Sequence, residues 1–260
     1  MDNKFLNGLF NLKGKTVLVT GATGQLGSEI CQAYVKTGAR VLGTDKELNH
    51  SKLIASDNIE YEKMDISKMK SVAKIFKKIY SSYGGLDILV NNAGVNTFEP
   101  FEDRPGDSFK WVMDVNLKGT FLCVQAYIKL AKEKKSKGCI INIGSIYGVI
   151  SPDFRIYTDC GRRNSEVYGA TKAGIIQMTR YFAVHAAKYG IRVNCVSPGG
   201  IFNPDNPQGK DFVKNYSYRC PMGRMAMVDE MIGGILYLSS DAASYVTGHN
   251  LLIDGGMSCW

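Results

Sequence analysis

The sequence predicts one α/β domain with a doubly wound parallel sheet of about seven strands, flanked by helices. Apolar, β-branched runs alternate along the chain with longer amphipathic segments, a pattern typical of parallel sheets. The strand runs are almost continuously apolar, as strands buried on both faces are. No linker, repeat or low-complexity segment divides the 260 residues, and a hydrophobic content of 45% supplies one substantial core. We therefore expect a single domain over residues 1–260.

The individual elements are located from periodicity and from the residues that end them. Strands are predicted over residues 15–21, 39–45, 59–65, 86–94, 138–145, 191–199 and 249–256. Helices are predicted over residues 25–38, 69–84, 111–135, 165–190 and 228–240, the first ending at Gly38 as a C-cap. In such a sheet ligands bind beyond the carboxyl ends of the strands. The residues that follow each strand therefore form the candidate site.

Charge and cysteine usage exclude several other classes of protein. The net charge is +8, but the basic residues are not gathered into one arm, and the densest cluster, "KEKKSKG" (132–138), is typical of a solvated helix end. Nucleic acid is therefore not an expected partner. The seven cysteines are scattered without a C-x-x-C and there are three histidines, so we expect reduced core thiols and no metal site.

The sequence also lacks the marks of a membrane or exported protein. No apolar run reaches the roughly 18 residues that a membrane helix needs. The first 16 residues have polar breaks and no small-residue cleavage site, so a signal peptide is not expected. We expect a cytoplasmic protein with a small-molecule substrate and no membrane partner.

A glycine-rich turn follows the first predicted strand. In "TGATGQLG" (20–27), Gly21, Gly24 and Gly27 are spaced three apart where a strand meets a helix. Glycine allows the backbone to approach a pyrophosphate, and the helix N-terminus favours its charge. A glycine trio alone also occurs in structural turns, but the flanking strand and helix favour a dinucleotide. The cofactor contacts predicted here are Gly21, Thr23, Gly24, Gln25 and Leu26.

An acidic residue ends the second predicted strand. Asp45 lies 18 residues beyond Gly27, where a carboxylate accepts the ribose hydroxyls of adenosine and repels a 2′-phosphate. An N-cap or turn role for Asp45 is the alternative, and the neighbouring Lys46 weakens the discrimination. We expect NAD as the cofactor, with NADP less favoured.

Three further strand ends carry candidate residues. In "DIS" (65–67), Asp65 has two equally favoured roles. It either contacts the adenine edge, with Ile66 beside it, or caps the helix that follows. "NNAG" predicts close passage of the chain against the cofactor at Asn92, Ala93 and Gly94. "VNLKG" places Asn116 inside a helix, where asparagine is unfavourable, so a functional or packing reason is expected.

Together, "TGATGQLG", "NNAG", "VNLKG", Ser145 in "NIGS", "YGATK" and "VSPGG" resemble the short-chain dehydrogenase/reductase family over about residues 14–257. The resemblance implies a Rossmann-type fold, an NAD(P)-dependent interconversion of alcohol and ketone, and a homo-oligomer (tetramer or dimer) built through helices 111–135 and 165–190. It also implies cofactor contacts from Pro198, Gly199 and Ile201.

The same resemblance implies a catalytic tetrad of Asn116, Ser145, Tyr168 and Lys172. Residues four apart share a helix face, so Lys172 lies beside Tyr168, and its ammonium favours the phenolate. Tyr168 is then the general acid/base and Ser145 orients the substrate oxygen. Tyr168 and Lys172 also contact the cofactor, and Asn116 holds a water that relays protons from Lys172.

The chain departs from the family pattern at two places. Gln25 stands where the middle glycine of T-G-x-x-x-G-x-G is usual, which places fine cofactor geometry in doubt. Ser145 and Tyr168 are 23 positions apart where about a dozen is usual, because of an insertion near 151–166. Its Arg155, Arg162 and Arg163 predict either an anion site or, equally, a solvated loop or oligomer contact.

The insertion, with residues 197–216, resembles a bacterial subgroup linked to surface-carbohydrate and flagellin modification, which makes nonulosonic acids. Residues 200–218 are expected to form an irregular substrate lid because of Pro204, Pro207 and Gly209. The leading hypothesis is an oxidoreductase acting on a sugar or anionic sugar derivative. The alternatives are a 3-oxoacyl-thioester reductase and a non-catalytic dinucleotide-sensing protein.

Overall fold

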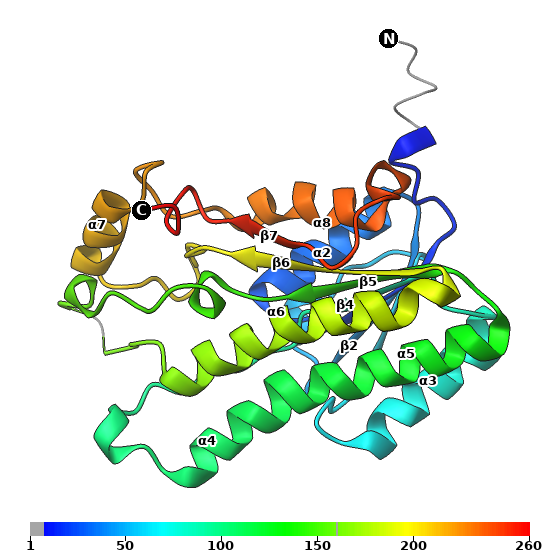
Figure 1. The fold of residues 1–260 in the computed structure, drawn as a ribbon, viewed down its shortest axis with the longest axis horizontal. Helices are drawn as coiled ribbons and strands as arrows, with labels where there is room; N and C mark the ends of the chain where they lie inside the picture. Colours follow the sequence, from blue (N-terminus) through cyan, green and yellow to red (C-terminus); the bar gives the residue numbers. More distant parts are fainter. Residues whose placement is uncertain (1–7, 160) are drawn as a thin grey trace.

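Seven parallel strands form the centre of the protein (Figure 1). Their bounds are β1 (Thr16–Thr20), β2 (Arg40–Asp45), β3 (Ile59–Lys63), β4 (Ile88–Asn91), β5 (Gly138–Ile143), β6 (Ile191–Pro198) and β7 (Asn250–Ile253). The order across the sheet is β3-β2-β1-β4-β5-β6-β7, and every pair of neighbours is parallel. This confirms the predicted doubly wound α/β fold.

The computed structural model describes residues 8–159 and 161–260. Residues 1–7, which are part of the stretch on which the signal-peptide expectation rests, lie outside the described residues. Cys160, which belongs to the insertion and to the predicted core thiols, lies outside them as well. Five of the six described cysteines are buried, and Cys259 is exposed.

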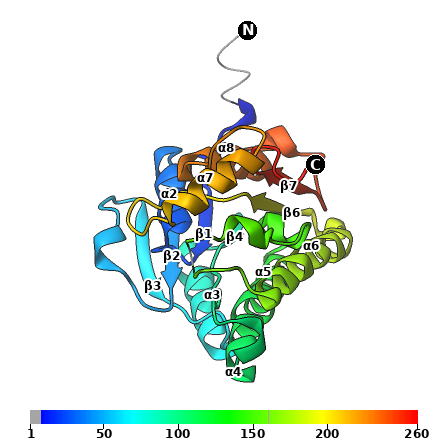
Figure 2. The same cartoon turned by 90° about the vertical axis from the view of Figure 1, so that its left-hand side faces the viewer.

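Helices cover both faces of the sheet, as the end view of Figure 2 shows. They are α2 (Gln25–Lys36), α3 (Met69–Tyr83), α4 (Gly106–Val112), α5 (Thr120–Lys134), α6 (Glu166–Ala186), α7 (Lys210–Arg219) and α8 (Ile232–Ser239). Because side chains alternate along a strand, Leu18 of β1 packs in the cluster that contains α3, α5 and α6. Val17 and Val19 pack in the opposite cluster, with α2 and α8.

The strand order reverses between β1 and β4, and this reversal positions the site. The connection after β1 runs through α2 to one side of the sheet, whereas the connection after β4 runs through α4 and α5 to the other. The two loops diverge, which leaves a crevice at the carboxyl edge of the sheet. The segments that follow β1, β2, β4, β5 and β6 therefore meet at one edge.

Two helical predictions differ from the structure. The predicted helix over 111–135 begins earlier, at Gly106 after Pro105, and contains a π-helical segment, Met113–Gly119, between α4 and α5. The expected irregular lid near 200–218 contains a helix, α7, after an irregular stretch. Helix α7 begins at Lys210, after Gly209 at the N-cap. Pro204 and Pro207 therefore precede the helix and do not interrupt it.

Candidate active site

The glycine turn after β1 is shaped by contacts that leave no room for side chains. Gly21 has a φ of 65°, and a Cβ there would lie 2.7 Å from the Ala93 Cα. A Cβ on Gly27 would overlap the Gly21 carbonyl. Helix α2 then begins at Gln25 after Gly24, whose N-cap position has no side-chain hydrogen bond. The first-turn N–H groups of α2 have no partner within the helix, so they are available to an anion.

Asp45 is held at the end of β2 by Thr23. One carboxylate oxygen accepts hydrogen bonds from the Thr23 N–H at 3.1 Å and from its hydroxyl at 2.8 Å. The other oxygen accepts from the Lys46 N–H at 2.8 Å. A carboxylate has about four acceptor positions, so Asp45 keeps capacity for a further donor. Thr23 therefore holds the Asp45 carboxylate in place by hydrogen bonds. Thr23 itself does not line the cavities described below.

A cavity of about 410 Å³, which we name the glycine-turn cavity, extends from this turn along the sheet edge. Asp65 lines it and accepts from the Ser67 N–H at 2.9 Å and hydroxyl at 2.6 Å, rather than capping α3, whose N-cap is Lys68. Lys46 also lines this cavity. The predicted cofactor residues that line it are Gly21, Gly24, Gln25, Leu26, Asp45, Asp65, Ile66, Asn92, Ala93 and Gly94.

A second cavity of about 350 Å³, the tyrosine cavity, contains three of the four predicted catalytic residues. Its lining includes Ser145, Tyr168 and Lys172, and also Pro198, Gly199 and Ile201. Residues common to both cavities are Leu26, Asn92, Gly94 and Val95. The two cavities therefore form one continuous cleft across the point where the strand order reverses.

Lys172 places a buried cation next to Tyr168. Its side-chain nitrogen lies 5.4 Å from the centre of the Tyr168 ring, and the residue is 4% exposed. The ammonium donates one hydrogen bond, to the Ile143 carbonyl at 2.8 Å. Within residues 8–159 and 161–260 no carboxylate pairs with Lys172. A buried ammonium with unused N–H groups favours an oxygen-rich ligand beside it.

Ser145 follows β5 and lines the same cavity. Its hydroxyl oxygen accepts from the Tyr147 N–H at 3.1 Å, as the N-cap of a short 3₁₀ turn. The hydroxyl proton has no acceptor in the described part of the chain. Ser145 can therefore donate to an oxygen that enters the tyrosine cavity.

Asn116 is fully buried in the π-helical segment and does not line the tyrosine cavity. Its side chain accepts from the Val95 N–H at 2.8 Å and donates to the Val95 carbonyl at 2.9 Å and to the Thr171 hydroxyl at 3.1 Å. The predicted functional or packing reason is therefore visible as a clamp between the loop after β4 and α6. π-Helical turns are frequent at functional sites because they redirect a side chain.

The three arginines of the insertion do not share one site. Arg155 forms a bidentate pair with Asp153, at 2.8 Å for both contacts, and its side chain is 87% exposed. Arg162 donates to the backbone carbonyls of Asn206 and Pro207. Arg163 lines a third cavity of about 1010 Å³, the outer cavity, which shares Asn164 with the tyrosine cavity.

The insertion and the predicted lid instead pack on each other. The Asp159 carboxylate accepts from the backbone N–H groups of Asp211 and Phe212, at 2.8 and 2.9 Å, and so caps α7. A Cβ on Gly209 would overlap that carboxylate, which explains the glycine. The rings of Tyr157 and Phe212 lie 4.9 Å apart between centroids. Residues distant in sequence thus form one structural unit beside the cleft.

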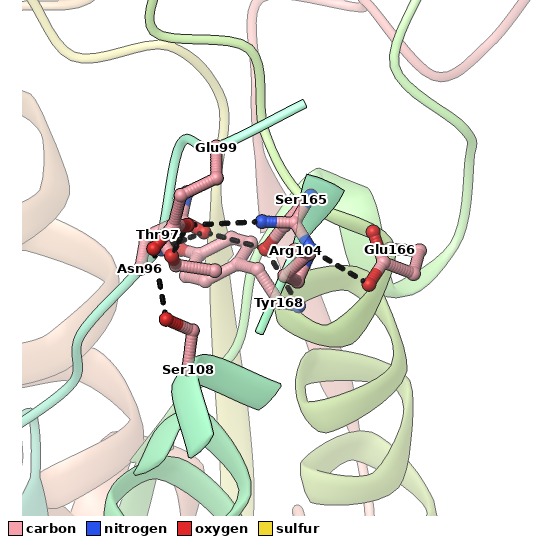
Figure 3. Close-up of polar contacts among 8 residues, drawn as sticks. All are labelled: Asn96, Thr97, Glu99, Arg104, Ser108, Ser165, Glu166 and Tyr168. Atoms are coloured by element: carbon pink, nitrogen blue, oxygen red, sulfur yellow. Dashed lines mark hydrogen bonds and ion pairs between the residues drawn. The ribbon is translucent and has the colours of Figure 1, made fainter. Parts of the chain in front are cut away.

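Sequence reasoning missed several polar residues at this edge of the site, which Figure 3 shows. Arg104, whose side chain is 6% exposed, donates to Glu166 at 2.9 Å and contacts Glu99 at 3.3 Å. Asn96 accepts from the Ser165 hydroxyl at 2.8 Å, and Ser165 caps α6 by accepting from the Tyr168 N–H. Ser165, which the sequence analysis placed as the first residue of the predicted helix 165–190, is its N-cap, and a serine there is a usable capping signal, whereas no sequence signal indicated Arg104.

The cleft fits a dinucleotide on structural grounds. The uncapped N-terminus of α2 suits a phosphate, the remaining acceptor capacity of Asp45 suits ribose hydroxyls, and the unused N–H groups of Lys172 suit a second ribose. Among the described residues there is no cluster of three or more metal-ligating side chains. In that same part of the chain, every helix is too short or too polar to cross a membrane.

Comparison with known proteins identifies the family. Residues 21–258 match the family described as Enoyl-(Acyl carrier protein) reductase. A D-arabinitol 2-dehydrogenase (ribulose-forming) from Candida tropicalis is 34% identical, over 96% of this chain and 95% of its own length. Among solved structures, a short-chain dehydrogenase from Leptospira borgpetersenii with bound NAD⁺ has a TM-score of 0.88 and 46% identity, covering 95% of this chain and 94% of that one.

A gluconate 5-dehydrogenase from Burkholderia cenocepacia, solved with NADP and tartrate, has a TM-score of 0.86 and 27% identity, covering 98% of this chain and 99% of that one. The dehydrogenase from Candida tropicalis and the two solved structures each match 95% or more of this chain. The chain therefore belongs to the short-chain dehydrogenase/reductase family and is an NAD(P)-dependent oxidoreductase.

Proposed function

We propose that the protein interconverts a secondary alcohol and a ketone at the tyrosine cavity, with NAD as its cofactor. The observation that carries this proposal is the shared cavity of Ser145, Tyr168 and Lys172, continuous with the glycine-turn cavity. A proton-transfer group, an oxygen-orienting hydroxyl and a buried cation thus face one space beside a dinucleotide-sized cleft.

The residues divide the reaction between them. Bound in the cleft, the nicotinamide ring supplies or accepts a hydride. Tyr168 removes the proton from the substrate hydroxyl during oxidation and returns it during reduction. Ser145 donates its free hydroxyl proton to the same substrate oxygen and holds it in place. The Lys172 side-chain nitrogen lies 5.4 Å from the centre of the Tyr168 ring and binds the nearby ribose. Asn116 fixes the loop at Val95 and completes the tetrad by holding a water that relays protons from Lys172.

Asp45 supports NAD as the preferred cofactor. Thr23 and the Lys46 N–H fix the carboxylate, so its negative charge stands at the adenosine end of the glycine-turn cavity. A 2′-phosphate placed there meets like charge. The Lys46 side chain, which lines the same cavity, is exposed and offsets this effect only in part.

We further propose a sugar or an anionic sugar derivative as the substrate, in surface-carbohydrate biosynthesis of the nonulosonic-acid type. The sequence resemblance of residues 151–166 and 197–216 supports the pathway. The activities of the arabinitol and gluconate dehydrogenases support a polyhydroxylated substrate. Arg163 in the outer cavity is the insertion arginine that remains a candidate for the anionic group. The lid role of residues 200–218 is part of this proposal.

A 3-oxoacyl-thioester reductase is the second candidate, and the outer cavity favours it. This cavity is large, about 1010 Å³, and the side chains of Phe98, Phe101 and Phe154 line it. An apolar wall of that kind suits an acyl chain.

We also propose that the protein is a cytoplasmic homo-oligomer, a dimer or tetramer joined through α5 and α6. Phe121 of α5 and Tyr181 and Val184 of α6 are 39%, 65% and 83% exposed, respectively. Exposed apolar side chains on adjacent helices are typical of a subunit interface. Light scattering of the purified protein measures the mass, and a monomer would contradict this proposal.

The first experiment is a titration of the protein with NADH and with NADPH, followed by a screen of substrates with the preferred cofactor. The screen contains polyols, free sugars, phosphosugars, nucleotide sugars and 3-oxoacyl thioesters. Turnover of a sugar or polyol with NAD(H) supports the leading proposal, and turnover of thioesters supports the second. Tyr168→Phe is expected to abolish turnover and to leave NADH binding intact; a fully active variant would refute the assigned role.

A further inference from the structure

A chain of neutral polar side chains joins the loop after β4 to the insertion, on the wall of the tyrosine cavity. Asn96 donates to the Asn164 side-chain oxygen at 2.7 Å. Asn164 donates to the Tyr157 hydroxyl at 3.1 Å, and that hydroxyl lies 3.0 Å from the Tyr147 hydroxyl. Burial raises the pKa of the Tyr147 phenol, so Tyr147, at the end of this series of hydrogen bonds, stays uncharged.

The hydrogen bonds fix the orientation of both amides. The Asn96 oxygen accepts from the Ser165 hydroxyl and from the Thr97 N–H, each at 2.8 Å, so its NH₂ group must be the one facing Asn164. The Asn164 oxygen accepts this bond, so the Asn164 NH₂ group faces Tyr157. Neither amide can turn over without losing hydrogen bonds.

Each amide keeps one unused donor. An NH₂ group carries two N–H bonds, and within residues 8–159 and 161–260 one of them is used in Asn96 and one in Asn164. Both asparagines line the tyrosine cavity with Ser145 and Tyr168. Lys172 is the one charged side chain in that lining. The lining of the tyrosine cavity therefore includes two neutral side chains that each keep one unused N–H donor.

We infer that Asn96 and Asn164 bind a second substrate oxygen, on the carbon next to the reacting carbon. The substrate is thereby a vicinal diol in one direction and an α-hydroxy ketone in the other. This inference rests on the proposed function, because Ser145 and Tyr168 must hold the reacting oxygen. A substrate with a single oxygen leaves these two donors, on half-buried side chains, without an acceptor in the substrate, which costs binding in the transition state.

The test compares 2,3-butanediol with 2-butanol, oxidised with NAD⁺, as the ratio of their kcat/KM values. The variants are Asn164→Ala and Asn164→Asp, the second of which keeps the volume and the acceptor for Asn96 but removes both donors. The matched control is Asn215→Ala. Asn215 also donates to the insertion, at the Thr158 hydroxyl (3.3 Å), and does not line the cavity.

We expect the wild type and Asn215→Ala to have a kcat/KM for the diol that is about tenfold or more above that for 2-butanol. Both Asn164 variants should lower this kcat/KM ratio by roughly 5- to 150-fold, the usual effect of one lost hydrogen bond in a site. NADH binding, measured by fluorescence, reports that the variants are folded. Equal use of both alcohols by the wild type, or an unchanged ratio in the Asn164 variants, overturns this inference and leaves the proposed function standing. Absence of turnover for every alcohol and ketone in the wider screen overturns the proposed function, and this inference with it.

Discussion

Removal of the Asp159 carboxylate should loosen α7 while the sheet keeps its stability. In the structure this carboxylate supplies the cap that Gly209, at the N-cap position, cannot provide. Asp159→Ala leaves the N–H groups of Asp211 and Phe212 without their acceptor. Asp159→Asn keeps one acceptor oxygen and is expected to have a smaller effect.

The magnitude follows from the two hydrogen bonds. Loss of a helix cap costs about 0.5–2 kcal/mol. Here both bonds are short and charge-assisted, but the carboxylate is exposed, so we expect about 1–2 kcal/mol. This change makes the open form of α7 roughly 5- to 30-fold more populated. Because α7 packs on the insertion through Phe212, Tyr157 should also become more mobile.

Native-state hydrogen exchange measures this opening directly. The backbone amides from Val213 to Tyr216 should lose protection by that factor, whereas amides of β1 should not change. The control is Asp205→Ala, which removes an exposed carboxylate from the same segment; Asp205 pairs with Lys52 at 2.6 Å and does not cap α7. Equal protection of α7 in Asp159→Ala and in the wild type would refute the capping role.

Three further predictions concern other parts of the chain. Gln25 donates a hydrogen bond to the Phe202 carbonyl at 2.7 Å. Gln25→Ala should therefore speed limited proteolysis within residues 202–209 by roughly fivefold, the effect of one lost hydrogen bond. An unchanged rate of proteolysis would contradict a stabilising role for this hydrogen bond. Arg104→Gln should lower the melting temperature by about 2–6 °C, whereas Lys110→Gln, at an exposed ion pair, should change it by less than about 2 °C. Burial raises the pKa of the Cys31 thiol to about 12, so Cys31 should resist thiol reagents at pH 8 until the protein is unfolded. Because the unfolded thiol ionises near pH 8.5, stability should also fall as the pH rises above that value. Rapid labelling of Cys31 in the native protein would contradict this burial, whereas the exposed Cys259 is expected to react.

The sequence predicted the sheet and most of the cleft because both follow from local patterns. Strand and helix periods, glycine turns and strand ends are properties of a few neighbouring residues. Once the strands are parallel, their carboxyl ends must meet, and Ser145 and Gly94 come together without further information. Lys172 lies four residues after Tyr168, so their proximity on α6 was also a local property.

Contacts between distant segments were decided by the tertiary structure alone. Nothing near Asp159 in the sequence indicates that it caps α7, and nothing near Gln25 indicates that it reaches Phe202. The insertion arginines suggested an anion site from their composition, but pairing with Asp153 and with the lid backbone separated them.

The sequence by itself thus determined the fold and the cofactor cleft, because regular elements and strand ends obey short-range rules. The proposed reacting groups followed from the resemblance of its motifs to the short-chain dehydrogenase/reductase family. The tertiary structure decided which side chains wall the tyrosine cavity. Asn96 and Asn164 are 68 positions apart, and only the packing of the insertion against the loop after β4 brings their amides together. Such pairings depend on long-range packing and on competition among many possible partners, and no short sequence pattern records that competition.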